Sequence, residues 1–236
     1  MTTEMVLGSG EMFDKIAARY DMMNRVLSFG MDKGWRRRTV KALALGAKPH
    51  VLDLATGTGD LAIEIARRVP GSTVIGIDPS SQMLAIAEKK VAKRGLAERV
   101  TFQVGDAQAL PLANCSVDAA TIAFGIRNVP DRVKGLRELA RVVRPGGRIG
   151  VLELGEPRKG VMGAAARFHC RQVIPRLGAL LSGAKEYKYL QRSMAAFPPA
   201  EEFARIMGTA GLHVIEVVPL TFGVCTLYVA TPVEES

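Results

Sequence analysis

Residues 51–60 read VLDLATGTGD, a mostly apolar run followed by a glycine-rich turn and then by a run with helical periodicity. A buried strand, a glycine turn and a helix in this order form the ligand-binding turn of open α/β sheets. Gly57, Gly59 and Ala62 match the spacing G-x-G-x-x-A, and Asp78 ends the next apolar run. The same spacing is typical of dinucleotide sites, so the turn predicts a nucleotide-like ligand without choosing between NAD and S-adenosylmethionine.

The charges around the turn favour a cationic ligand. A pyrophosphate binds at a bare helix N-terminus and is disfavoured by nearby carboxylates. Asp53 lies in the strand before the turn, and Asp60 opens the helix, where a cap or first-turn charge is the expected role. Asp53 is expected near the ligand, where its charge would repel a phosphate and attract the sulfonium and ammonium groups of S-adenosylmethionine.

Two further carboxylates follow the next strands. Asp78 can accept hydrogen bonds from both ribose hydroxyls, a role common to NAD and S-adenosylmethionine. Asp106 follows the strand predicted over 100–105, where it could accept from an adenine amino group while the Ala107 amide meets a ring nitrogen. Because ligands bind at strand ends in open α/β sheets, three acidic strand ends beside one glycine turn favour S-adenosylmethionine.

Strands and helices alternate along most of the chain. Apolar residues at helical spacing predict two N-terminal helices over 11–27 and 32–45. The alternation that follows predicts a parallel sheet covered on both faces, closed by a final helix and a strand pair. The strands are expected over 50–55, 73–78, 100–105, 117–124, 147–154, 213–220 and 224–230, and the helices between them over 60–69, 80–95, 131–143 and 199–211.

Composition narrows the class of protein. The 236 residues carry a net charge of +9, which indicates an anionic partner, either a membrane surface or a nucleic acid. Aromatic residues make up only 6% and are not interleaved with basic residues on a strand, so RNA binding is the weaker alternative. The three cysteines show no metal or disulfide spacing, which predicts a reducing compartment and no metal site. The N-terminus lacks the features of a signal peptide, and no apolar run is long enough to cross a membrane.

Several stretches of the sequence resemble the motifs of one protein family and follow one another in the order usual for that family. The specific ones are FDKIAARYDMMNRVLSFGMDKGWRR at 13–37 and FGIRNVPD at 124–131, and RVVRPGGRIGVLE at 141–153 and YKYLQRSMAAFP at 187–198 agree with them. Over nearly its whole length the chain resembles the class I methyltransferases, and in particular the quinone-ring C-methyltransferases of menaquinone and ubiquinone biosynthesis. Ala123 and Tyr228 depart from the family pattern.

The resemblance implies a Rossmann-like α/β domain with a seven-stranded, mostly parallel sheet and an antiparallel final strand. The expected parts are an N-terminal helical cap over 11–45, a cofactor-binding core over 46–157, a helical lid over 158–198 and a closing unit over 199–236. It also implies S-adenosylmethionine as the cofactor. The predicted cofactor contacts are Asp53, Gly57, Thr58, Gly59, Asp78, Met83, Asp106 and Ala107.

The implied reaction is attack by a ring carbon of a reduced polyprenyl quinone on the sulfonium methyl group. A quinone carbon is electrophilic, so the acceptor must be the quinol, and a base or an ordered water must remove the ring proton. Arg127 is predicted to stabilise the phenolate or orient a water, the alternative being that it holds its loop through backbone carbonyls. Asn128 is predicted to align a ring oxygen. His169 is a less favoured candidate.

The first helix and the residues after it are open to two interpretations. Tyr20 and Asn24, four residues apart, could lie over the cofactor and the acceptor ring, or Tyr20 could belong to the apolar stripe. Trp35 is expected to pack, with Arg36, Arg37 and Arg38 forming a solvated charged face, the alternative being direct contact of these residues with lipid.

The segment 158–192 carries eight basic residues and one Glu between apolar residues. It is expected to be a lid over an isoprenoid tunnel or an amphipathic contact with an anionic membrane. The predicted partners are a lipophilic quinol and the inner face of the cytoplasmic membrane, without nucleic acid, and a homodimer is a further expectation. The alternative acceptor is another lipidic or polycyclic natural product.

Overall fold

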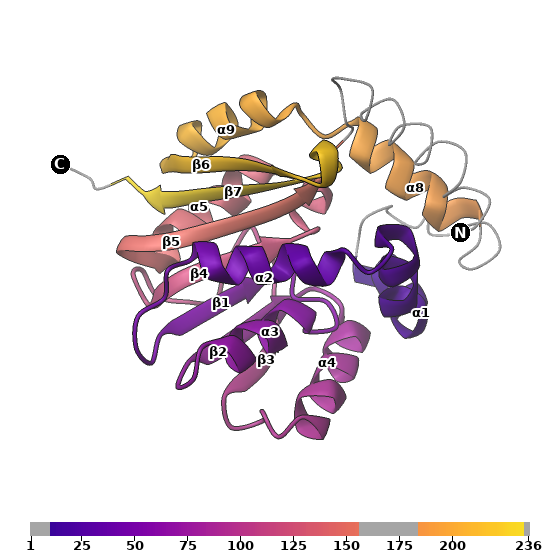
Figure 1. Cartoon of the computed structure of the whole chain (residues 1–236), viewed down its shortest axis with the longest axis horizontal. Helices are drawn as coiled ribbons and strands as arrows, with labels where there is room; N and C mark the ends of the chain where they lie inside the picture. The colour runs from indigo at the N-terminus through magenta and orange to yellow at the C-terminus, as the bar shows by residue number, and fades with distance from the viewer. Residues whose placement is uncertain (1–9, 156–183, 234–236) are drawn as a thin grey trace.

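The computed structural model describes residues 10–155 and 184–233, and Figure 1 shows their arrangement. The helices are α1 (Gly10–Ser28), α2 (Asp32–Ala42), α3 (Asp60–Arg68), α4 (Ser81–Lys93), α5 (Arg132–Val142), α8 (Ala184–Ala195) and α9 (Ala200–Thr209). The strands are β1 (His50–Leu54), β2 (Thr73–Asp78), β3 (Val100–Val104), β4 (Val117–Ala123), β5 (Val143–Leu154), β6 (Leu212–Leu220) and β7 (Cys225–Pro232). Short 3₁₀ turns, η1 (Ile126–Asn128) and η3 (Thr221–Gly223), follow β4 and β6.

The strands form one seven-stranded sheet in the order β3-β2-β1-β4-β5-β7-β6. Strands β1 to β5 pair in parallel, and β7 pairs antiparallel with both β5 and β6. The predicted fold class is confirmed, including the antiparallel last strand. The order reverses beside β1, because β1 lies between β2 and β4, and in open α/β sheets such a switch point is where ligands bind.

Two apolar layers hold helices against the two faces of the sheet. On one face Val40, Leu61 and Val91, from α2, α3 and α4, pack over β1 and β2. On the other face Leu139 of α5 and Phe203 of α9 pack over the central strands. Figure 1 shows α2 and α3 in front of the sheet, and α1 and α8 at the end where the parallel strands finish. Helices α1 and α8, which lie far apart in the sequence, therefore converge on the carboxyl edge.

Two local expectations, the end of α2 and the start of β5, need correction. Helix α2 ends at Ala42 rather than at residue 45, and Ala44 then adopts a positive φ of 46°. Strand β5 begins at Val143 rather than 147, with an irregular register opposite β4 that accommodates the residues between. Tyr228, where the chain departs from the family pattern, is buried in the core with its ring centroid 4.9 Å from that of Phe203.

The predicted lid over 158–198 lies mostly outside the described residues, which include only its last part, from α8 onward. His169 also lies outside them. Within the described residues, no helix is both long enough and apolar enough to span a bilayer.

Candidate active site

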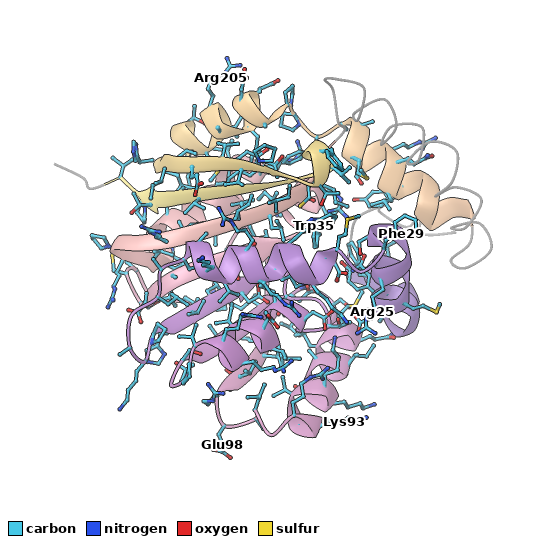
Figure 2. The ribbon with its side chains drawn as sticks, in the orientation of Figure 1. Arg25, Phe29, Trp35, Lys93, Glu98 and Arg205 are labelled. Carbon is cyan, nitrogen blue, oxygen red and sulfur yellow. The ribbon has the colours of Figure 1, made fainter. Side chains whose placement is uncertain are left out.

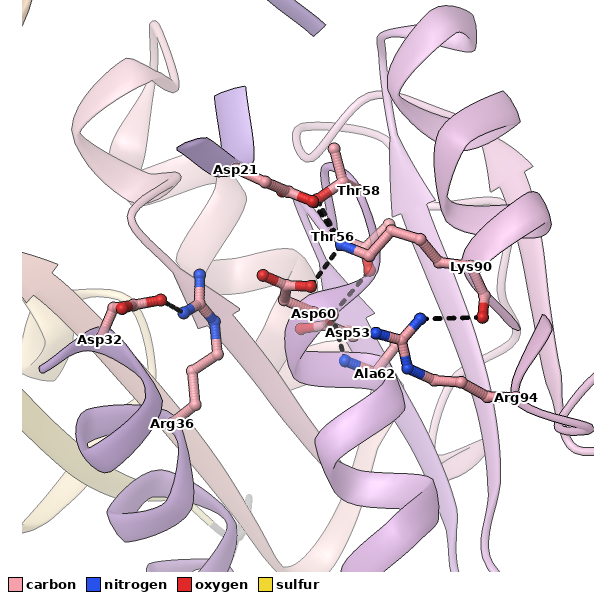
Figure 3. Close-up of polar contacts among 10 residues, drawn as sticks. All are labelled: Asp21, Asp32, Arg36, Asp53, Thr56, Thr58, Asp60, Ala62, Lys90 and Arg94. Atoms are coloured by element: carbon pink, nitrogen blue, oxygen red, sulfur yellow. Dashed lines mark hydrogen bonds and ion pairs between the residues drawn. The ribbon is translucent and has the colours of Figure 1, made fainter. Parts of the chain in front are cut away.

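The glycine turn after β1 is held from below by the buried carboxylate of Asp53 (Figure 3). One oxygen accepts hydrogen bonds from Thr56 Oγ1 at 2.6 Å and from the Ala62 amide at 3.1 Å, and the other accepts from Thr121 Oγ1 at 2.7 Å. These bonds tie the start of the turn, the first turn of α3 and the neighbouring strand β4 to one side chain. Asp53 therefore fixes the shape of the turn.

Both oxygens of the Asp53 carboxylate accept hydrogen bonds from the protein. Asp53 is not among the described residues that line the main cavity but lines a small adjoining one of about 20 Å³, together with Gly57 and Thr58. Burial raises the pKa of Asp53 from 3.8 to about 6, while the hydrogen bonds from Thr56 and Thr121 lower it. The carboxylate therefore holds the backbone of the turn, and its role as a counter-charge for a ligand stays a prediction.

A cavity of about 240 Å³ opens at the carboxyl ends of the parallel strands. Its wall combines the ends of β1, β2 and β4 with Phe13 of α1 and with Phe124, Val129 and Pro130 after β4. The predicted site residues that line it are Tyr20, Gly57, Asp78, Met83, Asp106, Ala107 and Asn128. Asp53, Thr58, Gly59 and Arg127 are not among the described residues of this wall.

Asp78 and Asp106 mark one end of the cavity. Asp78 accepts from the Gly57 amide at 2.8 Å and from the Ser80 amide at 2.9 Å. Burial raises the pKa of Asp78, against these two hydrogen bonds, which lower it. Asp106 is exposed and accepts from the amide and the side chain of Gln108. Both carboxylates retain acceptor capacity toward the cavity, since a carboxylate offers about four lone-pair sites.

Helix α1 is fastened over this end by two carboxylates. Asp14 accepts from Ser80 Oγ at 2.5 Å and from the Gln82 amide at 3.2 Å, at the start of α4. Asp21 accepts from Thr58 Oγ1 at 2.5 Å and from Lys90 Nζ at 2.8 Å. Phe13, next to Asp14, and Tyr20, next to Asp21, therefore lie against the cavity.

Lys90 joins the glycine turn to α1 and α4 (Figure 3). Its ammonium group contacts Asp21, Asp60 and Thr58. Burial works to raise the pKa of Asp60, but the charge and hydrogen bond of Lys90, together with the charges of Arg36 and Arg25, outweigh it, and the net direction is downward. Asp60 is thus the first-turn charge of α3, while Gly59 occupies the cap position with a positive φ of 77°. The Thr58 hydroxyl is engaged within the protein.

Arg127 forms a buried ion pair with Glu153 of β5, at 2.5 Å. The same guanidinium nitrogen donates to the Phe124 carbonyl at 2.7 Å, and the Arg127 amide donates to Glu153 Oε2 at 3.1 Å. Burial works to lower the pKa of Arg127, but the charge and hydrogen bond of Glu153, together with Tyr20 and Tyr189, outweigh it, and the net direction is upward. These contacts correspond to the loop-holding alternative. The charge also acts on Tyr20 and on Tyr189 of α8.

Asn128 and Tyr20 contribute further polar groups to the cavity wall. Asn128 Oδ1 accepts from the Tyr189 hydroxyl at 2.8 Å, which brings α8 to the cavity wall. Burial raises the pKa of Tyr20, while a hydrogen bond from Asn24 and the charges of Arg127 and Arg36 lower it. The phenol of Tyr20 is therefore a neutral group at neutral pH.

Sequence reasoning missed several members of the site. Glu153 could have been found, because a lone carboxylate within the apolar run VLEL requires a buried partner. Asp14, Asp21 and Lys90 carried no local signal, since their partners lie 30 to 69 residues away. The described histidines, His50 and His213, are exposed and lie at the starts of β1 and β6, away from the carboxyl ends where the cavity opens.

The residues at this edge fit S-adenosylmethionine. Adenosine requires acceptors for its hydroxyl and amino groups, which Asp78 and Asp106 supply from one end of the cavity. The backbone must also approach closely: a Cβ at Gly125 would lie 2.5 Å from that of Ala55, so the loops after β1 and β4 meet only because residue 125 is glycine. This strand order with a cavity at the switch point defines a class I S-adenosylmethionine-dependent methyltransferase.

The chain belongs to the ubiE/COQ5 methyltransferase family, whose model matches residues 3–232. A demethylmenaquinone methyltransferase of Thermus thermophilus is 48% identical over 92% of this chain and 98% of its own length. The ubiquinone/menaquinone biosynthesis C-methyltransferase UbiE of Geotalea daltonii is 45% identical over 92% of this chain and 93% of its own. The predicted family and cofactor are confirmed.

Solved structures with lower identity share the fold. A SAM-dependent methyltransferase from Aquifex aeolicus aligns with a TM-score of 0.61 at 23% identity, covering 83% of this chain and 88% of that one. The [4+2]-cyclase SpnF aligns with a TM-score of 0.69 at 18% identity, covering 95% of each chain. The fold therefore serves more than one reaction, and the acceptor must be argued from the site.

The raised pKa of Asp53 predicts a pH-dependent stability. Folding raises this pKa from 3.8 to about 6, so the folded state holds the proton more tightly. The stabilisation is complete below the unfolded-state pKa and is lost as the pH rises through about 6. The difference between the folded-state and unfolded-state pKa of Asp53 corresponds to about 3 kcal/mol of unfolding free energy.

Urea unfolding of wild type and Asp53→Asn checks this expectation. The wild-type free energy of unfolding minus that of the variant should fall by on the order of 2–3 kcal/mol between about pH 4 and pH 7. Thr121→Val is the matched variant, because it keeps the Asp53 carboxylate but removes a donor that lowers its pKa. The unfolding free energy of Thr121→Val should therefore fall more steeply with rising pH than that of wild type. Parallel pH profiles for wild type and Asp53→Asn would contradict the assignment.

Proposed function

We propose that this chain methylates a ring carbon of a reduced polyprenyl quinone, with demethylmenaquinol or its ubiquinone-pathway benzoquinol counterpart as the acceptor. The observation that carries the proposal is the identity of 42–48% to proteins named for these reactions, over more than nine-tenths of this chain. The cavity supports it, because its wall combines two carboxylates, Asp78 and Asp106, with aromatic and apolar residues such as Phe13, Phe124 and Val129.

The residues that line the cavity suit both ligands, the cofactor and the quinol. Asp78, Asp106 and Ala107 would hold the adenosine, with Met83 against its base and Gly57 beside its ribose. Phe13, Tyr20 and Phe124 would contact the flat quinol ring. When bound, S-adenosylmethionine supplies the methyl group on a sulfonium sulfur. Rate then depends largely on holding the acceptor carbon close to that group and in line with it.

Polar residues near the ring would assist by orientation and charge. Asn128 lines the cavity and would donate to a ring oxygen, with its orientation fixed by Tyr189. The Arg127 charge, which the protein holds beside Asn128, would favour the phenolate form of the acceptor. Because Arg127 does not line the described cavity wall, it acts as a positioning residue through its loop and through its field.

Peripheral contact with an anionic membrane forms part of the proposal. The chain carries a net charge of +9, and its acceptor is lipophilic. Met22, Phe29, Met31 and Phe222 are exposed on α1, on the turn after it and on η3. The turn and η3 meet, since Thr221 Oγ1 accepts from Trp35 and contacts Met31 Sδ at 3.7 Å. Figure 2 shows Phe29 beside α1, at the end of the molecule where the parallel strands finish.

Turnover with labelled methyl donor tests the acceptor directly. Demethylmenaquinol and its benzoquinol counterpart are presented in vesicles of anionic phospholipid, and flotation of the same samples reports binding to the lipid. We expect transfer of label to the reduced ring, none to the oxidised quinone, and release of the protein from the vesicles at high salt. Binding of S-adenosylmethionine without transfer to either quinol would indicate the alternative, another lipidic or polycyclic acceptor.

The Arg127–Glu153 pair predicts separable effects on stability and turnover. Arg127→Gln alone leaves a buried carboxylate without its counter-charge, which should cost about 3–5 kcal/mol of unfolding free energy. The double variant Arg127→Gln/Glu153→Gln removes both charges and should recover most of that loss. Its turnover should nevertheless remain about 100-fold below wild type, because the field on the acceptor is gone.

Denaturant unfolding and steady-state rates across pH measure the two effects in the same preparations. The affinity for S-adenosylhomocysteine serves as the control and should stay close to wild type in the double variant. Recovery of turnover together with stability would mean that Arg127 only holds its loop.

A further inference from the structure

Arg36 is a buried cation beside the glycine turn that neither holds the turn nor lines the main cavity. Arg36, in the first half of α2, is only 7% exposed, whereas its neighbours Arg37 and Arg38 are exposed. The expected charged face of α2 thus holds for two of the three arginines and is wrong for Arg36. The reason is helical phase, because Asp32, Arg36 and Val40 recur at intervals of four on the buried side of α2.

Two contacts hold the Arg36 guanidinium in place. One terminal nitrogen pairs with Asp32, whose other oxygen accepts from Ser28 Oγ at 2.9 Å. The guanidinium carbon also lies 5.5 Å from the centroid of the Phe124 ring, within the range of cation–π attraction. Asp32 is the only hydrogen-bond partner of Arg36 among the described residues, so further N–H groups of the guanidinium remain available.

The available side of Arg36 faces the site. Arg36 lines a small cavity of about 20 Å³ together with Gly57, Thr58 and the carboxylates of Asp53 and Asp60. Both carboxylates are already engaged within the protein, Asp53 by Thr56 and Thr121 and Asp60 by Lys90. This cavity shares Tyr20, Gly57 and Phe124 with the main one, so the two are continuous along the wall. Figure 3 shows the guanidinium between Asp32 and Asp60, and its charge lowers the pKa of Asp60.

The neighbouring cation, Lys90, is already satisfied. Its ammonium group contacts Asp21, Asp60 and Thr58, which uses its hydrogen-bonding capacity. Arg36 is therefore the cation at the turn that can still receive an anion. A planar guanidinium can keep Asp32 on one edge and accept a second carboxylate on another.

We propose that Arg36 binds the carboxylate of the amino acid end of S-adenosylmethionine. That ligand carries a sulfonium, an ammonium and a single carboxylate, and its adenosine is matched by Asp78 and Asp106, which line the main cavity but not the small one. The carboxylate then falls beside the glycine turn, where Arg36 and the turn amides lie. The inference rests on the use of this cofactor and is independent of the identity of the acceptor.

Two ligands separate this role from a general effect on the site. S-adenosylhomocysteine has the amino acid end, whereas 5′-methylthioadenosine has the same adenosine and sulfur without it. By calorimetry, Arg36→Gln should weaken S-adenosylhomocysteine by on the order of 10- to 100-fold and leave methylthioadenosine unchanged. Arg37→Gln, one residue along α2 on its exposed side, should change neither affinity.

Loss of Arg36 leaves Asp32 buried without its partner, so the experiment includes Arg36→Gln/Asp32→Asn, which removes both charges. Methylthioadenosine affinity reports in each variant whether the cavity is intact. Unchanged affinity for S-adenosylhomocysteine, or equal loss of both ligands in the double variant, would overturn the proposal. Either result leaves the quinol assay untouched, since wild-type turnover is measured separately.

Discussion

The site depends on one buried carboxylate. Asp53 joins Thr56, Ala62 and Thr121 by hydrogen bonds, and so fixes the glycine turn, the start of α3 and the adjacent strand with respect to one another. Burial alone would favour the neutral acid, but the donors around it support the charge. Without this anchor, the turn amides would have no fixed relation to the cavity.

The charges around the turn are arranged by function rather than spread as one negative surface. Asp14 and Asp21 are used to fasten α1, and Asp60 is neutralised by Lys90. Asp78 and Asp106 remain for the adenosine end, and Arg36 supplies the opposite charge at the other end. A ligand that carries both signs of charge matches this pattern better than a pyrophosphate, which agrees with the family of the chain.

Much of the fold was predictable because parallel strands read as short apolar runs that alternate with amphipathic helices. The members of the cavity at Gly57, Asp78 and Asp106 followed from their places at strand ends. The exact roles of Asp53 and Arg36 did not follow, because they depend on partners in three dimensions. Thr121 lies 68 residues from Asp53, and the burial of Arg36 depends on how α2 is rotated against the sheet.

A crystal structure of the chain with S-adenosylhomocysteine tests the central claim most directly. The account predicts that Asp53 keeps its hydrogen bonds to the protein and does not touch the ligand, while the ligand lies between the turn and the acidic strand ends with its carboxylate toward α2. A ligand whose ammonium group bonds directly to the Asp53 carboxylate, with the turn rearranged around it, would contradict the account.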